Sequence, residues 1–312
     1  MKRITDYLKV FETLVTETQK YITENNLKAM ILGISGGIDS TVCAAICHEV
    51  SKRTGIPLIG RSLPSQHNKE GETSTADLVG KAFCNDYKIV PLDYIDTSMW
   101  CVRKEDFKQN KLANGNIQAR LRMIYLYNLA SIKGGLVMDT DNLTENNLGY
   151  FTIHGDVGDF NPIGGLWKTE VFELAEYLVE YYSEQYKQED LKKLVYQNIT
   201  PELPYKVEAL SDSLQLKPTA GLGITNSDLD EIGAESYEQV DSILQEILAW
   251  KKLAISRGDV FQSKEEMKNV FLEEQQMLDI PIKIIMNVTN RHFASEFKRS
   301  KLPIVVNRNL YI

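Results

Sequence analysis

The sequence has few cysteines, a shortage of basic side chains and no long apolar run. Its 4 cysteines include no C-x-x-C pair and its 4 histidines no H-x-x-x-H pair, so neither a disulfide framework nor a zinc site is expected. The net charge of −8 argues against a broad nucleic-acid-binding surface. No segment has the length and apolarity of a membrane span or the core of a signal peptide. We therefore expect a soluble protein of the cytoplasm.

Short apolar runs alternate with helical patterns in the first half of the chain. Strands that alternate with helices form a parallel sheet covered on both faces, so the sequence predicts a doubly wound α/β fold. Ligands in such sheets bind beyond the carboxyl ends of the strands. The expected helices cover residues 4–25, 40–53, 70–87 and 116–135, and the expected strands cover residues 28–34, 56–64, 88–93 and 136–140.

The pattern changes in the second half of the chain. Residues 168–190 predict one long helix, and residues 236–276 predict two or three charged helices. Residues 200–228 are rich in turn-forming residues and predict a loop. No repeat or low-complexity tract separates the two halves. We expect a single domain over the whole chain, with a nucleotide-binding α/β core (1–165) and a helical part that ends in a C-terminal tail (166–312).

A glycine-rich loop stands between the first expected strand and the helix that follows it. In LGISGGIDST, residues 32–41, the backbone N–H groups of the turn and the helix dipole would bind an anion, and the serine hydroxyls add donors. No lysine follows the glycines as in a Walker A loop, and the segment does not match G-x-G-x-x-G. Phosphate charge therefore needs another neutraliser, and Asp39 fits a carboxylate that holds Mg²⁺ against phosphates. A simple capping role for Asp39 is the alternative.

This loop resembles the pyrophosphate-binding loop S-G-G-x-D-S of the ATP pyrophosphatases (the PP-loop superfamily), which cleave ATP between its α and β phosphates. Within that superfamily the chain is similar to the ammonia-dependent NAD synthetases. The resemblance implies an adenine nucleotide alpha hydrolase-like fold and a homodimer. It implies that ATP and Mg²⁺ adenylate deamido-NAD and that ammonia then displaces AMP. It extends over residues 33–303 and is carried by GISGGIDST, GNIQARLRMIYLYNLA, GLVMDTDNLTENNLGYFTIHGD, NPIGGLWKTEV, KPTAGL, SDLDEIGAESYEQVDSIL and EFKRSKLP.

The resemblance implies roles for individual residues. Asp39 and Glu145 would bind Mg²⁺, and Asp39 and Lys168 would be catalytic, Lys168 neutralising charge on the leaving pyrophosphate. Arg120 and Arg122 lie two apart on the expected helix and face different directions, and the resemblance favours Arg120 at the ligand. The implied ATP contacts are Gly33, Ile34, Ser35, Gly36, Gly37, Ile38, Asp39, Ser40, Thr140, Lys168 and Thr219, and the implied deamido-NAD contacts are Arg120, Ile153, Asp159, Phe297 and Lys298.

Several positions depart from the family pattern. Ile153 stands where the family usually has lysine, Phe297 where it has histidine, and Asp139 where it has glycine. The segment GDVGDFNP is one residue shorter than in the family, and the helices between Tyr237 and Phe297 are longer than usual. The ATP half of the site is intact and the dinucleotide half is altered, which predicts weaker recognition of deamido-NAD.

Two other functions are compatible with the same motifs. Another ATP pyrophosphatase could adenylate a different substrate, such as a tRNA base or a small acid, and a non-catalytic nucleotide-binding protein could keep the fold. The acidic charge balance and the lack of a C-x-x-C signature weigh against tRNA modification. A non-catalytic protein is disfavoured because the implied ATP, metal and catalytic residues are all present, namely Asp39, Thr140, Glu145 and Lys168. We expect ATP, deamido-NAD, ammonia and a second copy of the chain as partners, and neither nucleic acid nor membrane.

Overall fold

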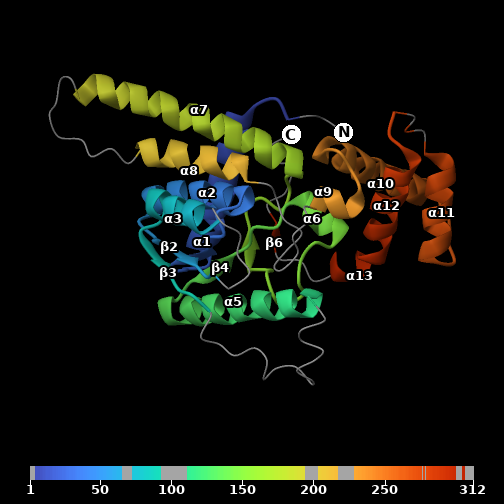
Figure 1. Cartoon of the computed structure of the whole chain (residues 1–312), viewed down its shortest axis with the longest axis horizontal. Coiled ribbons are helices and arrows are strands. Elements are labelled where there is room, and N and C mark those ends of the chain that lie inside the picture. Colours follow the sequence, from blue (N-terminus) through green and yellow to red (C-terminus); the bar gives the residue numbers. More distant parts are fainter. Residues whose placement is uncertain are drawn as a thin grey trace.

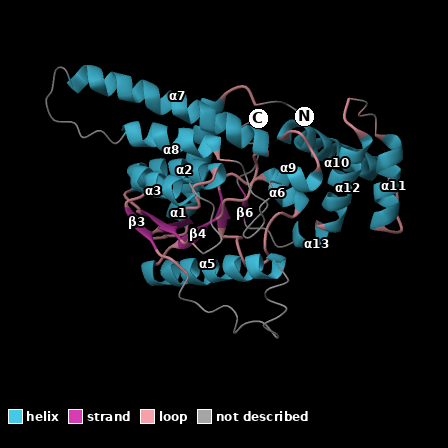
Figure 2. Cartoon of the chain, in the orientation of Figure 1, coloured by secondary structure: helices cyan, strands magenta, loops and turns pink. Residues whose placement is uncertain are grey.

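One parallel sheet runs through the computed structural model, with helices on both of its faces (Figures 1 and 2). Within the part of the chain that is described, six strands pair in the order β3-β2-β1-β4-β5-β6, and every pair is parallel. The predicted doubly wound α/β fold is confirmed. The structure describes residues 4–64, 72–92, 111–193, 203–216, 228–275, 277, 279–299 and 304–305.

The helices and strands predicted for the first half are present, with ends that differ by a few residues. The charged helices predicted for residues 236–276 are the two helices α10 and α11. The strands are β1 (Met30–Gly33), β2 (Leu58–Ser62), β3 (Asp86–Ile89), β4 (Leu136–Met138), β5 (Phe160–Asn161) and β6 (Ile304–Val305). The helices are α1 (Tyr7–Glu24), α2 (Ile38–Thr54), α3 (Glu72–Phe83), α5 (Lys111–Lys133), α6 (Leu143–Leu148), α7 (Lys168–Lys193), α8 (Leu203–Gln215), α9 (Asp228–Ile232), α10 (Tyr237–Arg257), α11 (Lys264–Glu274), α12 (Ile282–Ala294) and α13 (Glu296–Arg299).

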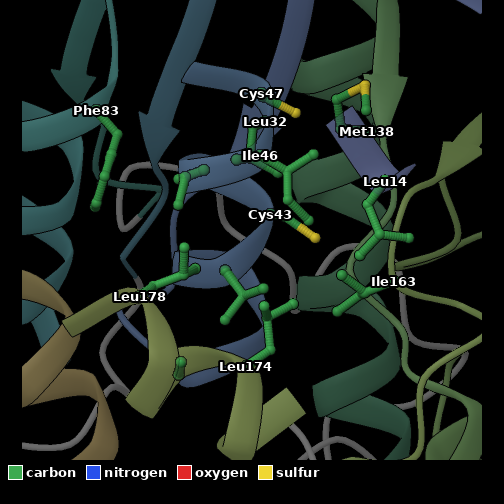
Figure 3. Close-up of a cluster of buried hydrophobic side chains, with 14 of the residues drawn as sticks. Leu14, Leu32, Cys43, Ile46, Cys47, Phe83, Met138, Ile163, Leu174 and Leu178 are labelled. Carbon is green, nitrogen blue, oxygen red and sulfur yellow. The ribbon is translucent and has the colours of Figure 1, made fainter. Parts of the chain in front are cut away.

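Strand β1 separates two apolar layers, because successive side chains of a strand point to opposite faces of the sheet. Met30 and Leu32 belong to the core beneath α1, α2, α3, α7 and α8. Ile31 belongs to the smaller core that α5 covers on the other face. Figure 3 shows part of the larger core around Leu14, Leu32, Cys43, Ile46, Cys47, Phe83, Met138, Ile163, Leu174 and Leu178.

The two cysteines of α2 are part of this larger core. Cys43 and Cys47 are free and buried, and burial raises the pKa of both thiols. A thiol that stays protonated is a poor nucleophile and a poor metal ligand. Both cysteines therefore act as small apolar residues, as their spacing of four along one helix predicts.

Helices α9 to α12 form a separate apolar cluster beside the sheet (Figure 1). Leu148 of α6 and Trp167, which precedes α7, belong to this cluster, whereas Leu174 of α7 belongs to the core under the sheet. The segments that carry the candidate site thus contact both parts of the molecule. The division into one domain with a core and a helical part stays a prediction. Among the described helices, none combines the length and the apolarity that crossing a membrane requires.

The predicted loop over residues 200–228 is wrong for its first half. Residues 203–215 form α8, which packs against α7 and α3. Pro204 is tolerated because first-turn N–H groups have no partner within a helix, and Leu210 and Ser213 are fully buried. Residues 217–227 lie outside the described chain. Strands β5 and β6 were not predicted either, because each has only 2 residues and leaves no periodic pattern.

We expect Leu210→Ala to lower the free energy of unfolding by about 2–4 kcal/mol, because it removes a fully buried side chain. Tyr205→Ala, on the exposed side of the same helix, is the matched control and should change stability by less than about 1 kcal/mol. Urea-induced unfolding of both variants measures the difference. Equal, small effects would show that α8 does not pack into the core.

Candidate active site

The glycine-rich loop joins β1 to the start of α2. Gly36 has a φ of 85°, which L side chains rarely adopt, and Gly37 is the N-cap of α2. Ser35 Oγ accepts a hydrogen bond from Gly37 N at 3.2 Å, and Ser40 Oγ donates one to Gly37 O at 2.9 Å. Gly37 brings no side chain to cap the first N–H groups of α2, so the positive end of this helix suits an anionic ligand.

The other residues of the predicted ATP loop support it from within the core. Gly33 ends β1, and the side chains of Ile34 and Ile38 are buried among apolar neighbours. These three positions could therefore contact a ligand only through the backbone. The serine hydroxyls of the loop also lie together, with Ser35 Oγ and Ser40 Oγ 3.0 Å apart.

Helix α8 holds the loop through Ser213, which the sequence analysis missed. Ser213 Oγ lies 3.0 Å from the Gly36 carbonyl oxygen and 2.7 Å from Thr41 Oγ1. Ser213 is fully buried, so these contacts replace hydrogen bonds to water. No local sequence pattern marks this serine, because its role depends on a helix that was predicted as a loop.

Lys168 connects the two carboxylates that were predicted to bind Mg²⁺. Its Nζ donates hydrogen bonds to Asp39 Oδ2 at 2.5 Å and to Glu145 Oε1 at 3.0 Å. The lysine side chain is 1% exposed, and each carboxylate side chain is 17% exposed. Gly37, not Asp39, is the N-cap of α2, so the capping alternative for Asp39 is not supported. The structure brings these three predicted residues together, and their roles in chemistry stay predictions.

Asn142 contacts the other oxygen of each carboxylate. Its Nδ2 donates to Asp39 Oδ1 at 2.9 Å, and its backbone N donates to Glu145 Oε2 at 3.3 Å. Its Oδ1 accepts from Glu145 N at 3.0 Å, which completes a capping box at the start of α6. The sequence analysis missed this fully buried residue. A cap residue followed three positions later by glutamate is a signal that could have found it.

Asp241 of α10 ties the start of α6 to the start of α7. Thr144 Oγ1 donates to Asp241 Oδ1 at 2.5 Å, and Thr169 N donates to Asp241 Oδ2 at 3.1 Å. Lys168 N in turn donates to Thr144 Oγ1 at 2.8 Å. Burial raises the pKa of Asp241 to about 6, against the lowering effect of these hydrogen bonds. The helical part of the chain therefore positions the backbone of Lys168.

Three of the residues predicted to contact deamido-NAD lie around one turn after α6. Arg120 Nη2 is 3.5 Å from the carbonyl oxygen of Ile153. Lys298 Nζ donates to the carbonyl oxygens of Gly149 and Phe151, each at 2.7 Å. Burial lowers the pKa of Lys298. Arg120, Ile153 and Lys298 are thus close neighbours, and Lys298 binds the chain's own backbone.

The remaining predicted contacts lie elsewhere or outside the described chain. Asp159 accepts hydrogen bonds from Tyr127 Oη at 3.0 Å and Val137 N at 2.9 Å, so its carboxylate joins α5 to β4. Thr140 is half-buried in the segment between β4 and α6. Thr219 lies outside the described residues, as does the side chain of Phe297 in α13. Arg122 Nε donates to Leu63 O at 2.8 Å, which agrees with the prediction that it faces away from Arg120.

Asp139, one of the departures from the family pattern, has a structural role. Its Oδ1 accepts from Asp141 N at 2.7 Å and from Asn161 Nδ2 at 3.1 Å, and its Oδ2 accepts from Gly158 N at 2.7 Å. A Cβ on Gly158 would lie 2.8 Å from both Asp139 N and Val137 O, so only glycine allows this approach. Burial raises the pKa of Asp139 to about 6. The carboxylate organises the connection between β4 and β5, which is the segment that is one residue short.

Asp39 and Glu145 are the candidate ligands for a metal ion beside the loop. Within the described ranges, no group of three or more His, Cys, Asp and Glu side chains is arranged to hold a metal ion. Mg²⁺ needs only one or two carboxylates when phosphate oxygens and water supply its other ligands. Asp39 Oδ2 and Glu145 Oε1 contact the same nitrogen atom and so lie close enough to share one cation. This donor set fits Mg²⁺ that is bound together with phosphates.

A parallel sheet with a glycine-rich loop after β1 and acidic residues at the same edge is typical of the class of nucleotide-binding α/β proteins. Residues 10–301 match the family model described as NAD synthase. The chain therefore belongs to the NAD synthase family, as the sequence motifs predict.

Two curated relatives agree with this assignment, and a solved structure shares the fold. The chain is 30% identical over 299 residues to the NH(3)-dependent NAD(+) synthetase of Pyrococcus furiosus, covering 94% of both chains. It is 31% identical over 303 residues to that of Thermococcus sibiricus, covering 97% of this chain and 98% of the relative. The structure of NMN synthetase from Francisella tularensis aligns with a TM-score of 0.66 at 24% identity, over 96% of this chain and 98% of that one. That last likeness supports the fold.

Asp241 is predicted to make stability depend on pH. Its pKa is about 6 in the folded state, against an ordinary value of 3.8. Between these values the folded protein keeps a proton that the unfolded chain has released, so stability is lost as the pH rises through 6. Between pH 5 and pH 8 the free energy of unfolding of the wild type should fall by about 1 kcal/mol more than that of Asp241→Asn, because the asparagine side chain stays neutral. Urea unfolding of both proteins at the two pH values measures this, and a pH-independent difference would contradict it.

Proposed function

We propose that the protein is an ammonia-dependent NAD synthetase that converts deamido-NAD to NAD with ATP and Mg²⁺. The observation that carries the proposal is the meeting of Asp39, Glu145 and Lys168 beside the glycine-rich loop, in a chain of the NAD synthase family. Family membership over residues 10–301 favours this reaction over adenylation of another substrate by a different ATP pyrophosphatase.

In the first step the nicotinate carboxylate of deamido-NAD attacks the α phosphate of ATP. The bond to the β phosphate breaks, so that an acyl adenylate forms and pyrophosphate leaves. The N–H groups at the start of α2 bind the phosphates, and Lys168 offsets the negative charge that grows on the leaving group. Asp39 and Glu145 would hold Mg²⁺, which supplies further charge neutralisation when bound.

In the second step ammonia attacks the carbonyl carbon of the adenylate. The bond to the AMP oxygen breaks, one proton leaves the nitrogen, and the carboxyl group becomes the carboxamide of NAD. Arg120, beside the carbonyl of Ile153, and Lys298 are the groups we assign to orienting deamido-NAD. We also assign contacts with deamido-NAD to Asp159, Phe297 and Ile153. Further contacts with ATP are assigned to Thr140 and Thr219.

We also propose that the protein works as a homodimer in the cytoplasm. Helix α5, which carries Arg120, exposes Ile124, Tyr127 and Ile132, with 58%, 39% and 70% of their surface accessible. An apolar stripe of this kind on a helix suits a second copy of the chain. The net charge of the sequence is −8, so acidic side chains outnumber basic ones, and this supports a protein that does not bind nucleic acid.

Incubation of the protein with ATP, Mg²⁺, ammonium and deamido-NAD should yield NAD, AMP and pyrophosphate in equal amounts, detected by mass spectrometry. Asp39→Asn and Glu145→Gln should each lower turnover at least about a hundred-fold, because charge neutralisation at the phosphates is lost. Both variants should still fold, as circular dichroism measures, although each loses one partner of the buried Lys168 ammonium and should be less stable than the wild type. Formation of ADP would contradict the reaction. If the protein turned over nicotinate mononucleotide or another acid in preference to deamido-NAD, that acid would be its substrate.

Ile153→Lys should lower the KM for deamido-NAD and leave the KM for ATP unchanged. A charge-assisted hydrogen bond from a lysine is worth about 1.5–3 kcal/mol, or about ten- to a hundred-fold in affinity. Ile153→Met is the matched control, since it extends the side chain without adding a charge. An unchanged or raised KM in Ile153→Lys would show that position 153 does not face the dinucleotide.

A further inference from the structure

Lys168 occupies the position between Asp39 and Glu145 that a divalent cation would take. Asn142 bonds to one oxygen of each carboxylate, Asp39 Oδ1 and Glu145 Oε2. The second oxygen of each, Asp39 Oδ2 and Glu145 Oε1, lies 2.5 and 3.0 Å from Lys168 Nζ. The two oxygens turned away from Asn142 are therefore the same two that the lysine ammonium contacts.

The ammonium group and a divalent cation cannot both occupy this position. Mg²⁺ needs ligand oxygens at about 2.0–2.1 Å, so it would come within a few ångströms of Nζ, where like charges repel strongly. Lys168 is 1% exposed, so water screens this repulsion poorly. A cation that binds Asp39 and Glu145 must displace the lysine side chain.

The charge balance favours the lysine as long as no phosphate is present. Two carboxylates and one ammonium carry one net negative charge. Adding a divalent cation alone would reverse this to one net positive charge, at the positive ends of α2 and α7. Anionic phosphates would remove that penalty, because they can bind both the displaced ammonium and the cation.

The lysine side chain can move without moving its backbone. Lys168 N is held by Thr144 Oγ1 at 2.8 Å, so the first turn of α7 stays in place. Beyond Cα the side chain has four rotatable bonds, and Nζ lies 5.8 Å from the centre of the Tyr237 ring. Rotation about these bonds would move Nζ away from the carboxylates while the backbone of Lys168 stays in place.

We propose that Lys168 is a resident counter-ion that keeps divalent cations out of the nucleotide-free protein and admits them only together with ATP phosphates. The inference rests on the proposed function for the involvement of ATP and metal. It adds an order of events: the phosphates draw Lys168 away from Asp39 and Glu145, and these carboxylates are then available to the cation.

The test is binding of Mn²⁺ alone to the full chain without nucleotide, measured by calorimetry and by electron paramagnetic resonance. The wild type should bind Mn²⁺ at least about ten-fold more weakly than Lys168→Met or Lys168→Gln, which lack the competing charge. Lys168→Arg keeps the charge and should bind as weakly as the wild type. Asp39→Asn in the Lys168→Met background should abolish the gained affinity.

Lys52→Met is the matched control, because it removes a lysine that pairs with Glu49 near the far end of α2. It should leave Mn²⁺ affinity unchanged. Equal affinity of the wild type, Lys168→Met and Lys168→Gln would overturn the proposal. So would undetectable binding in both variants when their thermal unfolding shows that they are folded.

A second measurement adds α,β-methylene ATP, which cannot release pyrophosphate. The wild type should then retain one Mn²⁺ with each bound nucleotide in equilibrium dialysis. Its Mn²⁺ affinity should no longer be lower than that of Lys168→Met. A lower affinity that persists would contradict displacement by phosphate. Neither measurement depends on turnover. Failure to form NAD would contradict the proposed function and would not affect the role of Lys168 in excluding cations. Equal Mn²⁺ affinities would contradict that role of Lys168 and would not affect the proposed function.

Discussion

The lysine at the start of α7 carries a positive charge into a place where 1% of its side chain is exposed. A buried charge is tolerated only when it is paired and hydrogen-bonded. Asp39 and Glu145 meet that need, and they come from the first turns of α2 and α6. The position of Lys168 therefore requires three helices to begin at one point of the sheet edge. Removing either carboxylate would leave the Lys168 ammonium with only one charged partner in a place that water hardly reaches.

The rest of the structure can be understood as support for this ion cluster. Asn142 fixes one oxygen of each carboxylate. Asp241 accepts from the Thr144 hydroxyl at the start of α6 and from the Thr169 backbone N at the start of α7. At the other end of α6, Arg299 Nη1 donates to Asn147 O at 2.8 Å and Arg291 Nε to Leu148 O at 3.2 Å. Basic side chains at the C-terminal end of a helix satisfy its last carbonyls and match its dipole. Helices α10, α12 and α13 thus hold the two ends of the short helix that carries Glu145.

Local signals predicted the part of the site that lies next to strands. Glycines after a short apolar run, followed by Asp39 at a helix start, mark an anion-binding turn without reference to distant residues. The meeting of Asp39 with Glu145 also follows from parallel strands, because their carboxyl ends share one edge of the sheet. By contrast, Ser213 contacts Gly36 across 177 positions of sequence, and Asp241 contacts Thr144 across 97. A single sequence contains no pattern that pairs such residues.

The departures from the family pattern differ in physical kind. Asp139, which stands where the resemblance implies a glycine, accepts three hydrogen bonds that hold the connection between β4 and β5, so its carboxylate has a structural role. Ile153 brings an aliphatic side chain that cannot donate a hydrogen bond, and its carbonyl oxygen lies 3.5 Å from Arg120 Nη2. Lys298, the neighbouring cation, is bound to the carbonyls of Gly149 and Phe151. To contact a ligand, Lys298 must exchange these bonds for new ones of similar strength, so its net contribution to affinity is smaller than that of a solvent-exposed lysine. In the proposed dinucleotide site, the backbone of the turn after α6 would therefore compete with the ligand for the ammonium group of Lys298.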